Sequence, residues 1–118
     1  MSNTSPGYSR MGIPSESRGY IQYLLDPSSD DKQSRFLLHY ATRSQVGSLG
    51  EIFYNIRVNL DSFPTPIVTE LRKHLPLIEK LGSKDISWKD RRDLVARKRR
   101  TVLRLLKLTA PLIHTVLH

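Results

Sequence analysis

Four cations stand in an unbroken row near one end of this 118-residue sequence, Arg97-Lys98-Arg99-Arg100. Arginine presents a planar fork of N–H donors that matches two phosphate oxygens, and lysine adds a compact positive charge. Such a row neutralises phosphates and releases their condensed counterions, so it favours binding to a polyanion. The same composition is typical of a nuclear-import signal. A further interpretation is a solvated helix face without a partner, although such faces normally alternate in sign.

The positive charge of the chain is concentrated around this row. The net formal charge is +8, and the segment 84–107 holds ten lysine and arginine residues against three aspartates, which gives +7. The other 94 residues therefore carry only +1. A field this local attracts polyanions. We predict that the segment binds nucleic acid and that its binding residues are Lys89, Arg91, Arg92, Arg97, Lys98, Arg99, Arg100, Arg104 and Lys107.

Recognition of single strands usually needs aromatic side chains among the cations, because unpaired bases stack on them. Trp88 is the one aromatic residue in the basic segment, and its place at a predicted helix start favours a role as a core anchor. The remaining aromatic residues lie well upstream. We therefore expect contacts with phosphates and little sequence specificity.

Two other classes of function remain open. In the first, residues 99–117 form a basic amphipathic helix on an anionic membrane, with Leu103 and Leu106 on its apolar face. The competing interpretation of those leucines is that they belong to the last core helix. In the second, the protein is a helical adaptor that binds a protein partner through an exposed apolar patch and uses the cationic row only for import.

No pattern in the sequence predicts catalysis. Cysteine is absent, which excludes thiolate nucleophiles, disulfides and cysteine-ligated zinc. No P-loop, nucleophile elbow or dinucleotide-binding glycine pattern occurs. His114 and His118 have the i, i+4 spacing of metal ligands, but two histidines without a third ligand are a weak signal. We expect a non-enzymatic protein without a metal or cofactor.

The elements that must position the cations are predicted to be helices. Residues 1–19 are rich in serine, glycine and proline and predict a disordered tail, and residues 20–118 predict one helical domain. Apolar spacing and capping residues predict helices over about 30–43, 46–58, 66–81 and from Trp88 onward, with Pro76 kinking or splitting the third. The helix over 30–43 carries Phe36, Leu37 and Tyr40 at helical spacing. The predicted fold class is all-α, a small bundle of three to five short helices.

The sequence leaves the conformation of the cationic row open. Four adjacent cations repel one another, yet arginine and lysine both favour helix. In a continuous helix, Arg97, Arg100, Arg104 and Lys107 share one face and Arg99 lies off it. In an irregular connector, all four residues of the row can reach one anion together. We favour the continuous helix.

Three stretches resemble the small basic proteins of Maverick/Polinton elements and adintovirus-like animal DNA viruses: residues 49–52 (LGEI) with Asn55, residues 71–74 (LRKH) and residues 81–89 (LGSKDISWK). The likeness spans about residues 35–100, and Asp90 and Asp93 depart from it by interrupting the basic run. It implies a helical basic protein associated with a virion or genome. With the import-like row, and without a secretory leader or a bilayer-spanning apolar run, we expect a location in the nucleus or the virion.

Overall fold

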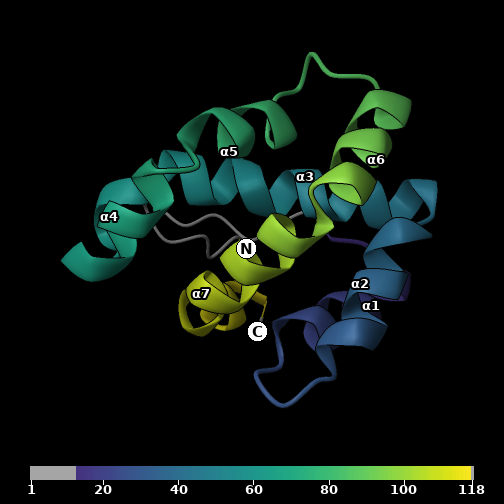
Figure 1. The fold of residues 1–118 in the computed structure, drawn as a ribbon, viewed down its shortest axis with the longest axis horizontal. Helices are drawn as coiled ribbons and strands as arrows, with labels where there is room; N and C mark the ends of the chain where they lie inside the picture. Colours follow the sequence, from purple (N-terminus) through teal and green to yellow (C-terminus); the bar gives the residue numbers. More distant parts are fainter. Residues whose placement is uncertain (1–12, 118) are drawn as a thin grey trace, which may run out of the picture.

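Seven α-helices pack around one core in the computed structural model, which describes the backbone of residues 13–117 and the side chains of residues 13–113 (Figure 1). They are α1 (Ser15–Leu25), α2 (Asp31–His39), α3 (Arg43–Val58), α4 (Thr65–Arg72), α5 (Leu75–Leu81), α6 (Trp88–Arg97) and α7 (Arg99–Leu117), with a 3-10 turn at Leu60–Ser62. No strand occurs among the described residues. The predicted all-α class is confirmed.

The core lies between α3 and α7, the two longest helices. α3 packs against α1, α5 and α6, while α7 contacts α1, α2, α4 and α6. Figure 1 shows α7, in yellow, crossing the middle of the domain in front of α3. The stripe predicted on α3 is fully buried, with members Leu49, Ile52, Phe53 and Ile56. Leu103 and Leu106 of α7 are buried as well. In this fold they are core residues, as expected if residues 99–117 form the last core helix.

The prediction of three to five helices is wrong, and Pro76 accounts for one of the additional helices. It splits the predicted helix over 66–81 into α4 and α5, because proline has no N–H for the helical ladder and clashes with the preceding turn. α5 begins at Leu75, with His74 as its N-cap, so that Pro76 falls in the first turn, where proline is tolerated.

A second additional helix is α1, which begins inside the segment predicted to be a disordered tail, and a third results from the break between α6 and α7. Residues 15–19 of that segment are helical, and residues 1–12 lie outside the described residues. Ser17 is buried, and its hydroxyl oxygen lies 3.1 Å from that of Ser44 in α3. Ile21 and Leu24 are buried one turn further along. Ser17 serves here as a small residue at a contact between two helices. From composition alone, a serine-rich segment is predicted to be a disordered tail.

Capping side chains set the starts of α2, α3 and α6. The Asp30 carboxylate accepts a hydrogen bond from the Gln33 backbone N–H at 2.9 Å, which confirms the predicted start of α2. Ser87 caps α6 in the same way. α3 begins at Arg43, three residues before its predicted start, because Thr42 and Gln45 form a capping box. α2 correspondingly ends at His39 rather than near residue 43.

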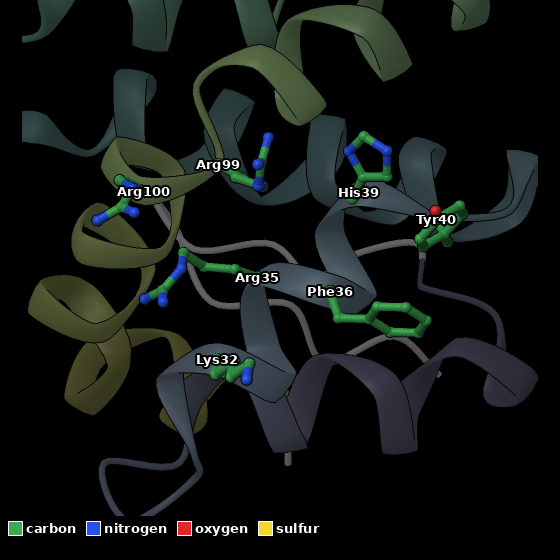
Figure 2. Close-up of a pocket in the computed structure, with 7 residues that line it drawn as sticks. All are labelled: Lys32, Arg35, Phe36, His39, Tyr40, Arg99 and Arg100. Atoms are coloured by element: carbon green, nitrogen blue, oxygen red, sulfur yellow. The ribbon is translucent and has the colours of Figure 1, made fainter.

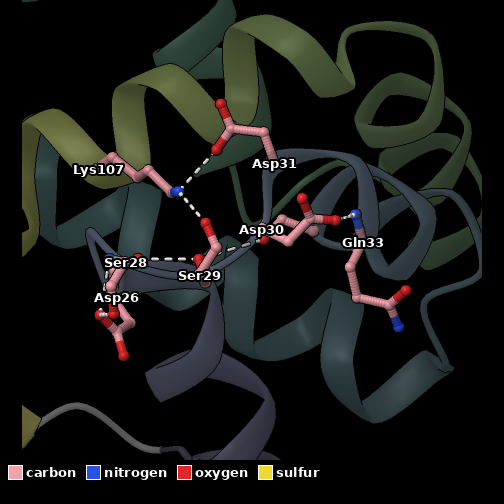
Figure 3. A network of polar contacts seen from close by, with 8 residues as sticks. Asp26, Ser28, Ser29, Asp30, Asp31, Gln33 and Lys107 are labelled. Atoms are coloured by element: carbon pink, nitrogen blue, oxygen red, sulfur yellow. Dashed lines mark hydrogen bonds and ion pairs between the residues drawn. The ribbon is translucent and has the colours of Figure 1, made fainter.

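Two ion pairs attach α7 to its neighbours. Lys107 Nζ lies 2.7 Å from Asp31 Oδ1 at the start of α2 (Figure 3), and Arg104 Nη2 lies 2.8 Å from Glu70 Oε2 in α4. The hydrogen bond from Lys107 lowers the pKa of Asp31 below its usual value of 3.8. A hydrogen bond from Lys73, supported by the charge of Arg104, lowers the pKa of Glu70 below its usual 4.5.

These shifts predict an acid-sensitive stability. Because the pKa of each carboxyl is lower in the folded state than in the unfolded state, its contribution is complete above the unfolded pKa and is lost as the pH falls through the folded pKa. The free energy of unfolding in urea should therefore fall below about pH 4, and only modestly, since water reaches both carboxylates. Asp31→Asn should remove part of this pH dependence. An unchanged pH profile in that variant would contradict the assignment.

Candidate functional site

The cationic row forms a corner between two helices. α6 ends at Arg97, Lys98 caps it with φ −107° and ψ 25°, and α7 begins at Arg99. The favoured continuous helix is therefore wrong. A straight helix over residues 88–117 would be roughly 45 Å long at 1.5 Å per residue, whereas the domain extends 34 Å along its longest axis. The break turns the chain so that Val95 of α6 and Val102 of α7 both reach the core.

The corner brings all four cations of the row to one opening. Together with Thr101, the four cations line a cleft of about 260 Å³. We call the four cations, Arg97, Lys98, Arg99 and Arg100, the basic corner. Three of them are exposed. Arg99 is half-buried, and its Nη1 donates a hydrogen bond to the Ala96 carbonyl at 2.7 Å, which fixes its stem. Its other N–H groups remain donors for an anion.

A second cleft, of about 380 Å³, joins the basic corner to α2 (Figure 2). We call it the α2–α7 cleft, and its lining consists of Lys32, Arg35, Phe36, His39, Tyr40, Arg99 and Arg100. The four residues from α2 and its C-cap residue Tyr40 follow the spacing i, i+3, i+4, i+7, i+8, which places them on one side of the helix. Figure 2 shows Arg35 extending from α2 toward Arg100, while Phe36 and Tyr40 lie together further along α2.

The two clefts form a strongly positive surface. Four cations line the α2–α7 cleft, and Arg97 and Lys98 add two more in the neighbouring cleft, which makes six. No carboxylate occurs among the described residues that line either cleft. Asp31 is adjacent in sequence to Lys32, but Lys107 already engages its carboxylate. Like charges gathered without counter-charges create a local potential that attracts anions.

Aromatic side chains complete the exposed face of α2. Phe36 and Tyr40 are 56% and 65% exposed, and their ring centroids lie 4.8 Å apart. His39 meets the Tyr40 ring edge-on at 4.6 Å. The helical spacing of Phe36 and Tyr40 thus marks a surface, and the buried side of α2 instead carries Ser34 and Leu38.

Three of the nine predicted binding residues have contacts that hold the fold. Arg91 donates hydrogen bonds from Nε to the Leu81 carbonyl at 2.9 Å and from Nη2 to the Ser83 carbonyl, and burial lowers the pKa of its guanidinium below the usual value. It fixes the loop after α5. Arg104 and Lys107 form the ion pairs of α7 described above. We exclude these three from the candidate interface.

Two further predicted residues lie beside the interface. The Arg92 guanidinium sits 5.0 Å from the centroid of the Trp88 ring, and Arg92 lines a neighbouring cleft of about 370 Å³ with His39, Tyr40 and Asp93. Lys89 is exposed in the first turn of α6 and lines none of these clefts. Trp88 is half-buried under Arg92, with Arg43 also 5.3 Å from its ring centroid.

The α2 half of the site was missed in the sequence, although a signal for it exists. The signal is a helical spacing that combines basic and aromatic side chains on one face: Lys32, Arg35, Phe36, His39 and Tyr40. These residues lie about 60 residues before the cationic row, so no local sequence pattern links the two parts of the site.

Other kinds of site find no support in the part of the chain that the structure describes. No group of three or more histidine, aspartate or glutamate residues there could hold a metal ion. The side chain of His114 and all of His118 lie outside the described residues. None of the described helices combines the length and the apolar character that crossing a bilayer requires. In comparisons with known families, curated proteins and solved structures, nothing matches this chain.

Proposed function

We propose that this protein is a non-enzymatic nucleic-acid-binding protein that contacts the phosphate backbone through the basic corner and the cations of α2. The observation that carries the proposal is the convergence of six cations, from segments about 60 residues apart, on two clefts that share Arg99 and Arg100. A fold gathers like charges at the expense of self-repulsion, which an anionic partner relieves.

Nucleic acid suits this surface better than the other polyanions considered. Four of the six cations are arginines, whose planar forks match phosphate oxygens. Binding to an anionic membrane through residues 99–117 would require Leu103 and Leu106 to leave the core, where both are buried. Contacts with phosphates position a nucleic acid without reading its sequence, so we propose little sequence specificity. Association with a viral genome or virion is a compatible setting.

The salt dependence of binding tests the proposal. If six phosphates are neutralised, log K against log salt should have a slope near −5 on duplex DNA, since each contact contributes about −0.9. Fluorescence anisotropy with a labelled duplex of about 20 base pairs, titrated between about 50 and 200 mM salt, measures the slope. An affinity that does not change with salt would overturn the proposed function.

A further inference from the structure

The face of α2 pairs cations with uncovered aromatic rings. Phe36 and Tyr40 are among the large apolar side chains that the fold leaves mostly exposed, and both line the α2–α7 cleft. Cations lie over two half-buried rings elsewhere: Arg57 and Lys84 over Tyr54, and Arg43 and Arg92 over Trp88. Among the described residues, no cation lies over the ring of Phe36 or Tyr40. Both side chains stay more than half exposed, so a ligand can reach them.

Neither ring is needed to fill the core. Leu38 and Ser34 form the buried side of α2, whereas the rings of Phe36 and Tyr40 lie against each other and His39 lies against Tyr40. An exposed aromatic pair does not contribute the hydrophobic stabilisation that burial would give. Exposed apolar patches of this kind mark interaction surfaces. The chemistry beside this pair restricts the partner, because Lys32, Arg35 and two arginines at the start of α7 line the same cleft with positive charge.

We infer that the α2–α7 cleft binds unpaired nucleotides, with a base stacked on Phe36 or Tyr40 and the flanking phosphates held by Lys32, Arg35, Arg99 and Arg100. The inference rests on the proposed function and names its substrate as single-stranded nucleic acid. Bases in a duplex are already stacked on one another, so these rings are useful only to bases that are unpaired. Every base has a π-face, so stacking of this kind adds affinity without sequence specificity.

The test compares two strands with equal numbers of phosphates. One is an oligothymidylate of about 20 nucleotides, which does not pair with itself, and the other is an abasic strand of the same length. Stacking of one base is worth about 1–3 kcal/mol, so the wild-type protein should bind the thymidylate at least about fivefold more tightly. This comparison requires no mutation, so a folding defect cannot obscure it.

Variants then locate the stacking. Phe36→Leu with Tyr40→Leu keeps apolar side chains at two exposed positions, so the fold should persist, and it should reduce thymidylate affinity to the abasic level without changing abasic binding. Tyr54→Leu is the matched control, since it removes a ring flanked by Arg57 and Lys84 outside the cleft. It should leave both affinities unchanged.

The possible failures are distinguishable. Equal, salt-dependent binding of the two strands by the wild type would overturn the stacking inference and leave the proposed function standing. Preferential thymidylate binding that survives in the double leucine variant would also overturn it, by placing the stacking elsewhere. Binding of neither strand, nor of duplex, at about 50 mM salt would overturn the proposed function itself.

Discussion

Replacing Arg97, Lys98 and Arg100 together by glutamine should lower the affinity for duplex DNA by about 100- to 500-fold near 0.1 M salt. These three exposed cations of the basic corner account for half of the six proposed phosphate contacts. Their loss should reduce the slope of log K against log salt by about 2.7, three times 0.9. Because the three side chains are exposed and form no ion pair among the described residues, the thermal midpoint should change little. Anisotropy titrations at several salt concentrations measure both quantities.

A charge-matched variant separates this local effect from a general field. Glutamine at Arg18, Arg57 and Lys80 removes the same net charge from exposed positions on α1, α3 and α5 that line neither cleft. That variant should lose only a few-fold in affinity, since screening weakens distant charges beyond about 10 Å at 0.1 M salt. Equal losses in the two triple variants would show that net charge, rather than the corner, drives binding.

Gly82→Ala should be the most destabilising single substitution that we propose. Gly82 ends α5 with φ −89°, which is ordinary for any residue, so its special role is close approach rather than the left-handed conformation of a common helix cap. A Cβ atom there would lie 2.6 Å from the backbone nitrogen of Tyr54 and 2.8 Å from its Cα. Backbone atoms cannot rotate away, so α3 and α5 must separate. We expect a loss of about 3 kcal/mol in unfolding free energy and a thermal midpoint lower by roughly 10 °C.

Gly47→Ala is the control for that prediction. It lies in α3, and a Cβ at this position meets nothing within 4 Å. Alanine in an exposed helix interior should therefore raise the unfolding free energy by about 0.5–1 kcal/mol. Urea unfolding of the two variants measures both changes. If Gly82→Ala were as stable as the wild type, the close packing of α3 against α5 would be contradicted.

Local signals in the sequence predicted much of the scaffold. The i, i+3, i+4, i+7 spacing on α3 located its buried stripe, and Asp30 and Ser87 located the starts of α2 and α6. These features depend on residues within one or two turns of each other, which is the range over which a sequence pattern reports directly on structure. Pro76 likewise marked a break, although the sequence did not decide between a kink and two helices.

The site depended on tertiary contacts that no local pattern contains. Whether the cationic row bends was decided by the packing of Val95 and Val102 into one core, and only the bend brings four cations to one opening. Phe36 and Tyr40 have the spacing of a core face, and their exposure follows from Leu38 being the residue that turns inward. From the sequence, Arg91 is expected to be a surface cation. In the structure its guanidinium donates hydrogen bonds to two backbone carbonyls.

Protection of lysines from acetylation tests the proposed interface most directly, since it uses the wild-type protein. Mass spectrometry would compare the reactivity of each lysine with and without a saturating oligothymidylate of about 20 nucleotides. Lys32 of the α2–α7 cleft and Lys98 of the basic corner should become protected, while exposed Lys73 and Lys80 on the α4–α5 side remain reactive. Protection of Lys73 and Lys80, with Lys32 and Lys98 still reactive, would contradict the account.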